Sequence, residues 1–278
     1  MKKILRKIAM CILVVVFAVS ATLFLRQLKD NQSGTASYES AAEVALRETV
    51  PEASTAPAQM TEEIAAENAE ETSVWVPVPV ENDPQMAEME KINLAALRQV
   101  NSDVVGWICI PDTKINYPLM QGEDNDFYLN HTWEKEPNSV GSIFLEYQNS
   151  PTFSDYNTIA YGHNMNSGAM FAELEYFALS KFQKSHPYVY VVTDAGVYRY
   201  EIFAFFQAEV ESLTYGMNPQ RSDTKQKFLD LALEKTWIDT GVQPQITDRI
   251  LTLSTCSGSN YDYRYVLQAR LPMMEVTQ

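Results

Sequence analysis

The chain has 278 residues, of which 46% are hydrophobic and 21% charged, so it has the length and composition of one globular domain with additional segments. The formal net charge is −15 at pH 7, and because so acidic a chain repels phosphate backbones, nucleic acid is not an expected partner. The three cysteines, Cys11, Cys109 and Cys256, are too few and too unevenly placed for a disulfide framework.

The first 29 residues predict a membrane anchor. Residues 8–25 are uncharged, apolar and free of Gly and Pro, and a membrane helix needs roughly 17–25 such residues. More cations precede this run than follow it, so we expect residues 1–7 to form a cytoplasmic tail and the domain to lie outside the cell. A cleaved signal peptide is the alternative, with small residues for cleavage at 18–21, but the apolar run is longer than a signal core and continues past that site.

Residues 26–83 predict a disordered acidic linker. From residue 30 to residue 83 the chain holds twelve acids and one base and is rich in Ala, Glu, Ser, Thr and Pro. This composition buries too little apolar surface to offset the entropy of the chain. We therefore expect a tether outside the core, and full peptide cleavage by a fragment that begins near Pro84.

Residues 84–278 predict a single catalytic domain rich in β-strands. Apolar residues at spacings of three and four predict one helix from Pro84 to about Val100. Many short strands separated by turn clusters, with few helices, favour a closed barrel or a sandwich with helical insertions. The expected strands are 104–110, 115–119, 141–147, 158–161, 188–193, 197–206, 249–254 and 265–271, and the expected inserted helices are 169–184 and 223–237.

The last two predicted strands place a thiol beside a cation. Alternation along the first of them puts Leu251 and Leu253 on the core face and Cys256 on the other face. Seven residues separate Cys256 from Arg264, and an antiparallel hairpin of that length would set both on one open face. A neighbouring cation favours the nucleophilic thiolate form, and a guanidinium can bind a carbonyl oxygen on which charge develops. Arg270 lies too deep in the strand for this role.

A histidine completes the candidate site. Acyl transfer by a thiol needs an imidazole to protonate the leaving amine, and His163 stands just after a predicted strand, next to Gly162. His131 and His186 are interpreted as structural, and Cys109, in an apolar strand, as a core residue. Residues 124–126 lack the glycine and glutamate of a calcium loop, so we expect neither a metal nor a cofactor.

These residues resemble the signatures of the sortase family. Residues 252–256 (TLSTC) look like its Thr-Leu-x-Thr-Cys motif, residues 161–165 (YGHNM) resemble the histidine motif of its class B, and Arg264 matches the family arginine. Residues 124–131 (DNDFYLNH) and 141–145 (GSIFL) also resemble class B stretches, so the resemblance covers about 84–271. One departure is Ser257, where class B members often have an acidic residue.

The resemblance implies a mostly β fold, a closed eight-stranded sortase-type barrel with an N-terminal helix and helical insertions. It implies a cysteine transpeptidase in which Cys256 attacks the carbonyl after a threonine in the C-terminal sorting signal of a secreted protein. The thioester then passes to an amine of peptidoglycan or of its lipid-linked precursor. The implied catalytic residues are Cys256, His163 and Arg264, and the implied substrate-binding residues are Ser254, Thr255, Asn125, Leu129 and Tyr215.

Three alternatives stay open on the sequence. One is a sortase that polymerises pilins through a pilin lysine. Another is a cysteine endopeptidase with the same three catalytic residues that releases its product to water. The third is a surface adhesion module, which would explain the anchor and the β-rich domain but not the spacing of Cys, His and Arg.

Overall fold

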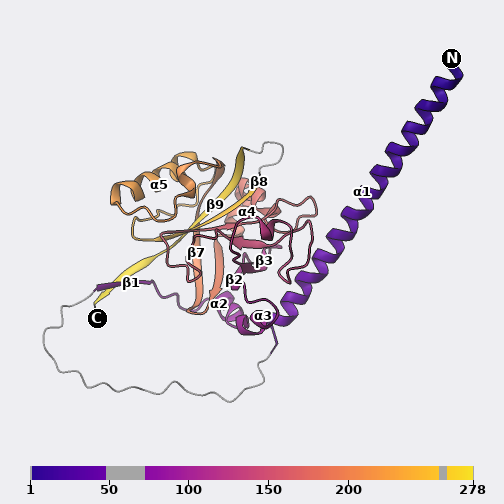
Figure 1. Cartoon of the computed structure of the whole chain (residues 1–278). Helices are drawn as coiled ribbons and strands as arrows, with labels where there is room; N and C mark the ends of the chain where they lie inside the picture. Colours follow the sequence, from indigo (N-terminus) through magenta and orange to yellow (C-terminus); the bar gives the residue numbers. More distant parts are fainter. Residues whose placement is uncertain (1, 48–72, 257–261, 278) are drawn as a thin grey trace.

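A closed barrel of eight strands forms the body of the molecule, as the computed structural model shows for residues 2–47, 73–256 and 262–277 (Figure 1). Its strands run in the order β2-β3-β4-β5-β8-β9-β7-β6 around the barrel. This confirms the expected mostly β, eight-stranded barrel with helical insertions. The strands are β2 (Val104–Cys109), β3 (Asn116–Met120), β4 (Ile143–Leu145), β5 (Asn157–Tyr161), β6 (Tyr188–Thr193), β7 (Gly196–Glu209), β8 (Arg249–Cys256) and β9 (Tyr263–Leu271).

Three neighbouring strands of the barrel, β5, β8 and β9, bring residues that are far apart in the sequence to one rim. β5 and β8 pair in parallel, with Tyr161 opposite Ser254, so the carboxyl ends of both strands meet at the same edge. Leu251 and Leu253 belong to the barrel core, as their alternation predicts. Ile250, on the opposite face, packs in a second cluster beneath helix α5 (Ser222–Lys235). Alternation therefore directs Cys256 away from the barrel core.

Two expected helices are each broken in two. The segment after Pro84 forms α2 (Pro84–Met89) and α3 (Leu94–Val100), because the Asn93 side chain accepts a hydrogen bond from Ala96 N and so caps a new helix. The helix expected at 169–184 is a 3₁₀ segment, η2 (Ala172–Ala178), followed by α4 (Ser180–Ser185), with extended backbone at Leu179. Two further 3₁₀ turns, η1 (Phe127–Leu129) and η3 (Leu213–Tyr215), flank the candidate site.

The expected disordered linker at 26–83 is wrong at its beginning. Helix α1 (Lys2–Ala45) continues without a break past the apolar run and packs its last turns onto the barrel. Its buried residues there are Gly34, Ser37, Tyr38, Ala41, Val44 and Ala45. They recur at spacings of three and four, a helical stripe made mostly of small side chains. Composition alone hid this stripe because small residues add little to a hydrophobicity average.

The same expectation is also wrong at its end. Residues 73–77 form β1 (Ser73–Pro77), which pairs antiparallel with β10 (Met273–Thr277) in a separate two-stranded sheet. The C-terminus therefore lies beside β1, as Figure 1 shows. Residues 48–72, the middle of the expected linker, lie outside the described residues.

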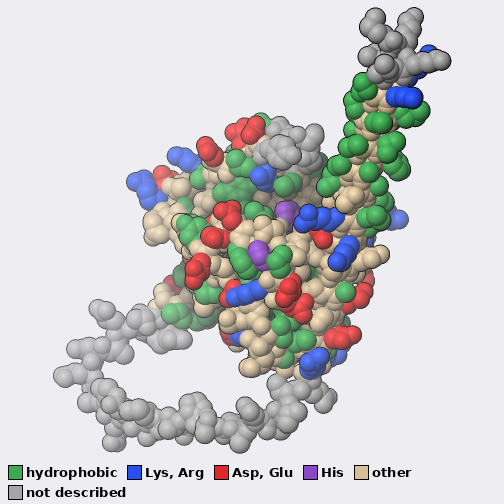
Figure 2. Space-filling model, turned by 45° about the vertical axis from the view of Figure 1, so that its right-hand side comes forward, with side chains coloured by type: hydrophobic (Ala, Val, Ile, Leu, Met, Phe, Trp, Pro, Cys, Tyr) green, Lys and Arg blue, Asp and Glu red, His purple; other side chains and the backbone are tan. Residues whose placement is uncertain are grey.

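The N-terminal half of α1 projects from the domain (Figure 2), and large hydrophobic side chains are exposed along it from Ile8 to Leu25. Its most apolar window has a mean hydropathy of 2.8 and is not buried against the barrel. A helix of this length and composition is compatible with crossing a membrane, a property that export signals share.

Candidate active site

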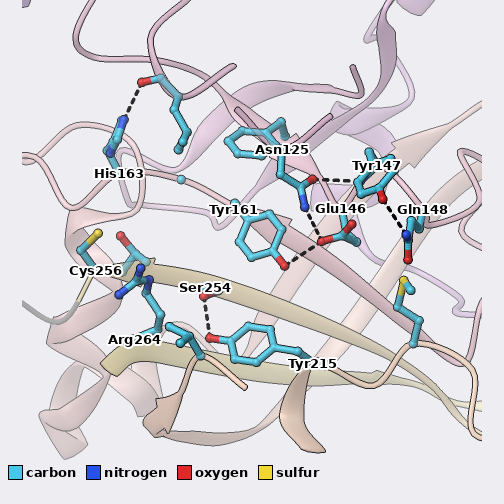
Figure 3. Close-up of a pocket in the computed structure, with 16 residues that line it drawn as sticks. Asn125, Glu146, Tyr147, Gln148, Tyr161, His163, Tyr215, Ser254, Cys256 and Arg264 are labelled. Carbon is cyan, nitrogen blue, oxygen red and sulfur yellow. Dashed lines mark hydrogen bonds between the residues drawn. The ribbon is translucent and has the colours of Figure 1, made fainter. Parts of the chain in front are cut away.

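The thiol and the cation meet across a pair of strands. Cys256 ends β8 and pairs directly with Arg264 of β9, which confirms the register expected from the hairpin. Both side chains are half-buried, and Figure 3 shows them together at one end of a cleft. The predicted connection between them lies largely at 257–261, outside the described residues.

The loop after β5 brings His163 to the same rim. Its backbone continues the pairing with β8, because Gly162 N donates to Ser254 O at 3.2 Å. The side chain of Asn164 then donates to the carbonyl of Cys256 at 3.0 Å. These two bonds tie the loop that carries His163 to the end of the strand that carries Cys256, so the positions of the two residues are coupled.

The ring of His163 has a defined tautomer. Its Nε2 lies 2.6 Å from the carbonyl oxygen of Leu129, and since a carbonyl oxygen only accepts, Nε2 carries the proton. In the neutral ring, Nδ1 is then the nitrogen that accepts a proton. Leu129 thus contributes to the site in two ways, because the residue lines the cleft and its carbonyl oxygen orients the ring of His163.

Close packing around residue 162 leaves room for glycine but not for a larger residue. A Cβ added there would lie 2.4 Å from Ile143 Cδ1 and 2.8 Å from Phe171 Cδ2, both buried side chains. We therefore expect Gly162→Ala to lower the free energy of unfolding by about 1–3 kcal/mol, the usual effect of overpacking a core. Thermal unfolding of the variant measures this. An unchanged melting temperature would show that the neighbouring core yields freely.

The cleft beside these three residues has a volume of about 510 Å³. All five residues expected to bind substrate line it: Asn125, Leu129, Tyr215, Ser254 and Thr255. The Tyr215 hydroxyl lies 3.0 Å from Ser254 Oγ, which links η3 to the cysteine strand. Burial raises the pKa of Tyr215 above its usual value, so its hydroxyl stays protonated. The structure brings together every residue expected at the site, while their roles in substrate binding stay a prediction.

A buried carboxylate that the sequence reasoning missed lies at the other end of the cleft (Figure 3). Glu146 is 9% exposed, and its Oε2 accepts from Asn125 Nδ2 at 2.6 Å and from the Tyr161 hydroxyl at 2.9 Å. Burial, and then the Glu146 charge, hold the pKa of Tyr161 well above its usual value. The sequence feature that could have indicated Glu146 is its position directly after the apolar residues 143–145.

The other cysteine of the barrel is unsuited to nucleophilic attack. Cys109 is 5% exposed, and burial, with a smaller contribution from Asp112, raises the pKa of its thiol to about 12. Deprotonation is therefore strongly disfavoured at neutral pH. This agrees with its interpretation as a core residue.

The alternative candidates for the arginine and the histidine have structural partners. Arg270 pairs with Ile250 in the strand register and holds Glu201 at 2.7 Å and Asp248 at 3.3 Å. His131 stacks on Phe127 with ring centroids 4.0 Å apart. His186 caps the end of α4 with its Nδ1 2.7 Å from the Phe182 carbonyl oxygen.

The comparisons with known proteins agree with this geometry. The family model of the sortase domain matches residues 108–272, more than half of the chain. Sortase B of Listeria monocytogenes is 36% identical over 181 residues, covering 64% of this chain and 73% of that protein. Sortase B of Staphylococcus aureus is 34% identical over 164 residues, covering 59% and 67%.

Solved structures extend the likeness to three dimensions. The Staphylococcus aureus sortase B–substrate complex aligns with a TM-score of 0.61 at 32% identity, over 66% of this chain and 85% of that one. An eight-stranded barrel with this sequence match defines a cysteine transpeptidase. The chain belongs to the sortase family, and its relatives from Listeria monocytogenes and Staphylococcus aureus are both sortases B.

Proposed function

We propose that this sortase forms its acyl-enzyme on Cys256, with His163 as acid and base and Arg264 as the cation that binds the oxyanion. The observation that carries the proposal is the direct pairing of Cys256 with Arg264 across two strands. The loop that carries His163 is hydrogen-bonded to the same end of β8 through Gly162 and Asn164. Cross-strand neighbours have Cβ atoms about 4.5–5.5 Å apart. A substrate carbonyl placed over the sulfur therefore lies within reach of the guanidinium.

The proposed reaction has two acyl transfers. The Cys256 thiolate attacks the carbonyl that follows a threonine of the sorting signal, and negative charge develops on the carbonyl oxygen, which Arg264 stabilises. The intermediate collapses to a thioester as His163 donates a proton to the leaving amine. An incoming amine then attacks the thioester, His163 takes its proton, and the thiolate leaves.

The cleft supports a peptide as substrate. It runs from Cys256 to Glu146, with Tyr161 and Tyr215 between (Figure 3). A volume of about 510 Å³ lies within the range of pockets that hold ligands of a few residues. Sortase B of Staphylococcus aureus, which has the same fold, has been solved in complex with substrate. We infer that Asn125, Leu129, Tyr215, Ser254 and Thr255 bind the residues of the signal that precede the cleaved bond.

For the cellular setting we propose a single-pass anchor at residues 8–25, a cytoplasmic tail at 1–7 and a catalytic domain outside the cell. The apolar half of α1 supports this arrangement. The protein substrates are then secreted proteins that carry a C-terminal signal, and the acceptor is an amine of peptidoglycan or of its lipid-linked precursor. A pilin lysine is the alternative acceptor.

Incubation of the full chain in detergent with a threonine-containing signal peptide, with and without an added amine, tests this proposal. Amine-dependent ligation after the threonine is the expected result. Cleavage at the same rate with no ligated product would identify a hydrolase instead. Absence of turnover across a library of threonine-containing peptides would favour the adhesion module.

A further inference from the structure

The last turns of α1 pack against residues 133–142, the segment between η1 and β4 that lies against His163. Asn138 Nδ2 donates to the Asp30 carbonyl at 3.1 Å and to Ser33 Oγ at 2.9 Å. Ser139 Oγ lies 3.0 Å from Asp30 Oδ2. A Cβ added to Gly34 would lie 2.9 Å from Val140 Cγ2, so helix and segment are in close contact here.

The contact continues one turn further along α1. Trp133, which is fully buried, donates its indole N–H to the carbonyl of Ser37 at 2.9 Å, and Ser37 Oγ donates to Glu134 Oε2 at 2.6 Å. These polar contacts span residues 133–139 of the domain. Because a flexible tether would make no such set of directed bonds, α1 is an integral part of the domain on this side.

Tyr38 is the α1 residue whose hydrogen bonds reach Gly141 and Ser142. It is 8% exposed, and its ring meets the ring of Tyr117 edge-on, with centroids 5.2 Å apart. Its hydroxyl donates to the Gly141 carbonyl and lies 3.0 Å from Ser142 Oγ. Burial raises the pKa of Tyr38 far above its usual value, so the hydroxyl remains a donor at any physiological pH.

Gly141 in turn lies directly against the histidine. Its φ of +63° favours glycine, and a Cβ there would be 2.7 Å from the Leu129 carbonyl oxygen and 3.0 Å from His163 Cδ2. The Leu129 carbonyl is the group that accepts from His163 Nε2. Ser142 N also donates to the Tyr128 carbonyl at 2.9 Å. Gly141 and the η1 turn therefore form one support on which the ring of His163 rests.

We propose that Tyr38 is a positioning residue for His163, acting from the anchor helix through Gly141 and the Leu129 carbonyl. The proposal rests on the proposed catalytic role of His163. The segment expected to be a passive linker then contributes to the geometry of proton transfer. A ring that shifts by about 1 Å loses alignment with thiol and leaving amine, and such displacements lower rates by up to about a hundredfold.

The test compares the full chain with its Tyr38→Phe, His163→Ala and Tyr190→Phe variants on one signal peptide. Tyr190→Phe is the matched control, because this buried tyrosine donates to Asp83 at 3.0 Å and does not line the cleft. We expect Tyr38→Phe to lower kcat about tenfold or more with KM within about twofold, since transition-state geometry is disturbed and binding is not. Tyr190→Phe should keep wild-type kcat, although both changes remove a tyrosine hydroxyl that donates a hydrogen bond.

Ser142→Ala provides a second variant. It removes the side-chain partner of the Tyr38 hydroxyl, so we expect it to lower kcat as Tyr38→Phe does. The pH profile of kcat should change in shape for Tyr38→Phe, because a displaced His163 ring is no longer aligned with the thiol and the leaving amine for proton transfer. Wild-type kcat and pH profile in Tyr38→Phe, together with an inactive His163→Ala, would overturn the positioning role and leave the proposed function intact. Equal losses in Tyr38→Phe and Tyr190→Phe would also overturn it, as a general effect of stability. An active His163→Ala would refute the proposed function itself.

Discussion

Cys256→Ala is expected to abolish both cleavage and ligation of the signal peptide while the barrel stays folded. The change removes the proposed nucleophile and leaves no thiol of similar reactivity in the barrel, because Cys109 is buried and its thiol has a pKa of about 12. Cys256 ends its strand half-exposed, so loss of its sulfur creates no core cavity. Peptide turnover followed by chromatography, with thermal unfolding by circular dichroism, measures both parts.

Cys109→Ala is the matched control for the nucleophile. It removes a buried thiol, so we expect a lower melting temperature together with wild-type turnover per folded molecule. A Cys256→Ala protein that still forms a covalent adduct with the peptide would contradict the assignment and direct attention to another nucleophile.

The second large effect is expected at Arg264. If its guanidinium binds the oxyanion, the interaction exists mainly in the transition state, and Arg264→Ala should lower kcat/KM by about 10²–10³, or roughly 2.7–4 kcal/mol. Arg264→Lys should recover little of this, because an ammonium lacks the planar fork of a guanidinium. Steady-state kinetics on one peptide, corrected for the folded fraction, compares the variants.

Arg270→Ala is the control on the same strand. Arg270 binds Glu201 and Asp248, and Asp248 is 3% exposed, so the change leaves a buried carboxylate without this partner. We expect a lower melting temperature and a kcat/KM close to wild type per folded molecule. The reverse pattern, a crippled Arg270→Ala and a normal Arg264→Ala, would refute the oxyanion role of Arg264.

The short strands and the pairing of Cys256 with Arg264 were predictable because they follow from short-range rules, whereas the closed eight-stranded barrel was implied by the resemblance to sortases. Alternation in residues 250–256 separates the core leucines from Cys256, and the loop length places Arg264 opposite the thiol, as the strand register shows. The placement of His163 and Cys256 at one rim depends on the parallel pairing of β5 with β8. Strand periodicity does not specify this long-range arrangement, and it was the need of a thiol for an imidazole, together with the resemblance to sortases, that pointed to His163.

The parts that were not predicted depend on weak or distant signals. The stripe of α1 from Gly34 to Ala45 consists mostly of small side chains, and its partners lie about a hundred residues away. β1 pairs with the far end of the chain. Glu146 follows a strand as any turn residue would, and its place in the cleft depends on its tertiary contacts with Asn125 and Tyr161. In each case tertiary packing decides what local composition leaves open.

The structure also changes the expected stability and activity of a fragment that begins at Pro84. The expectation that a fragment from Pro84 keeps full activity rested on an unstructured linker. Such a fragment lacks Tyr38 and the other α1 residues of the core, as well as the partner strand of β10. Removal of these contacts exposes apolar surface on the barrel and frees the segment that supports His163, so we now expect reduced stability and reduced turnover.

In the proposed reaction, Cys256 carries the acyl group between donor and acceptor. The most direct measurement is the mass of the full chain quenched in acid during turnover of a signal peptide, followed by mapping of the modified residue. The predicted result is an adduct on Cys256 with the mass of the peptide up to and including threonine, sensitive to hydroxylamine and depleted when the acceptor amine is added. Product formation with no adduct on Cys256 at any time point, or an adduct on another residue that turns over with the amine, would contradict the account.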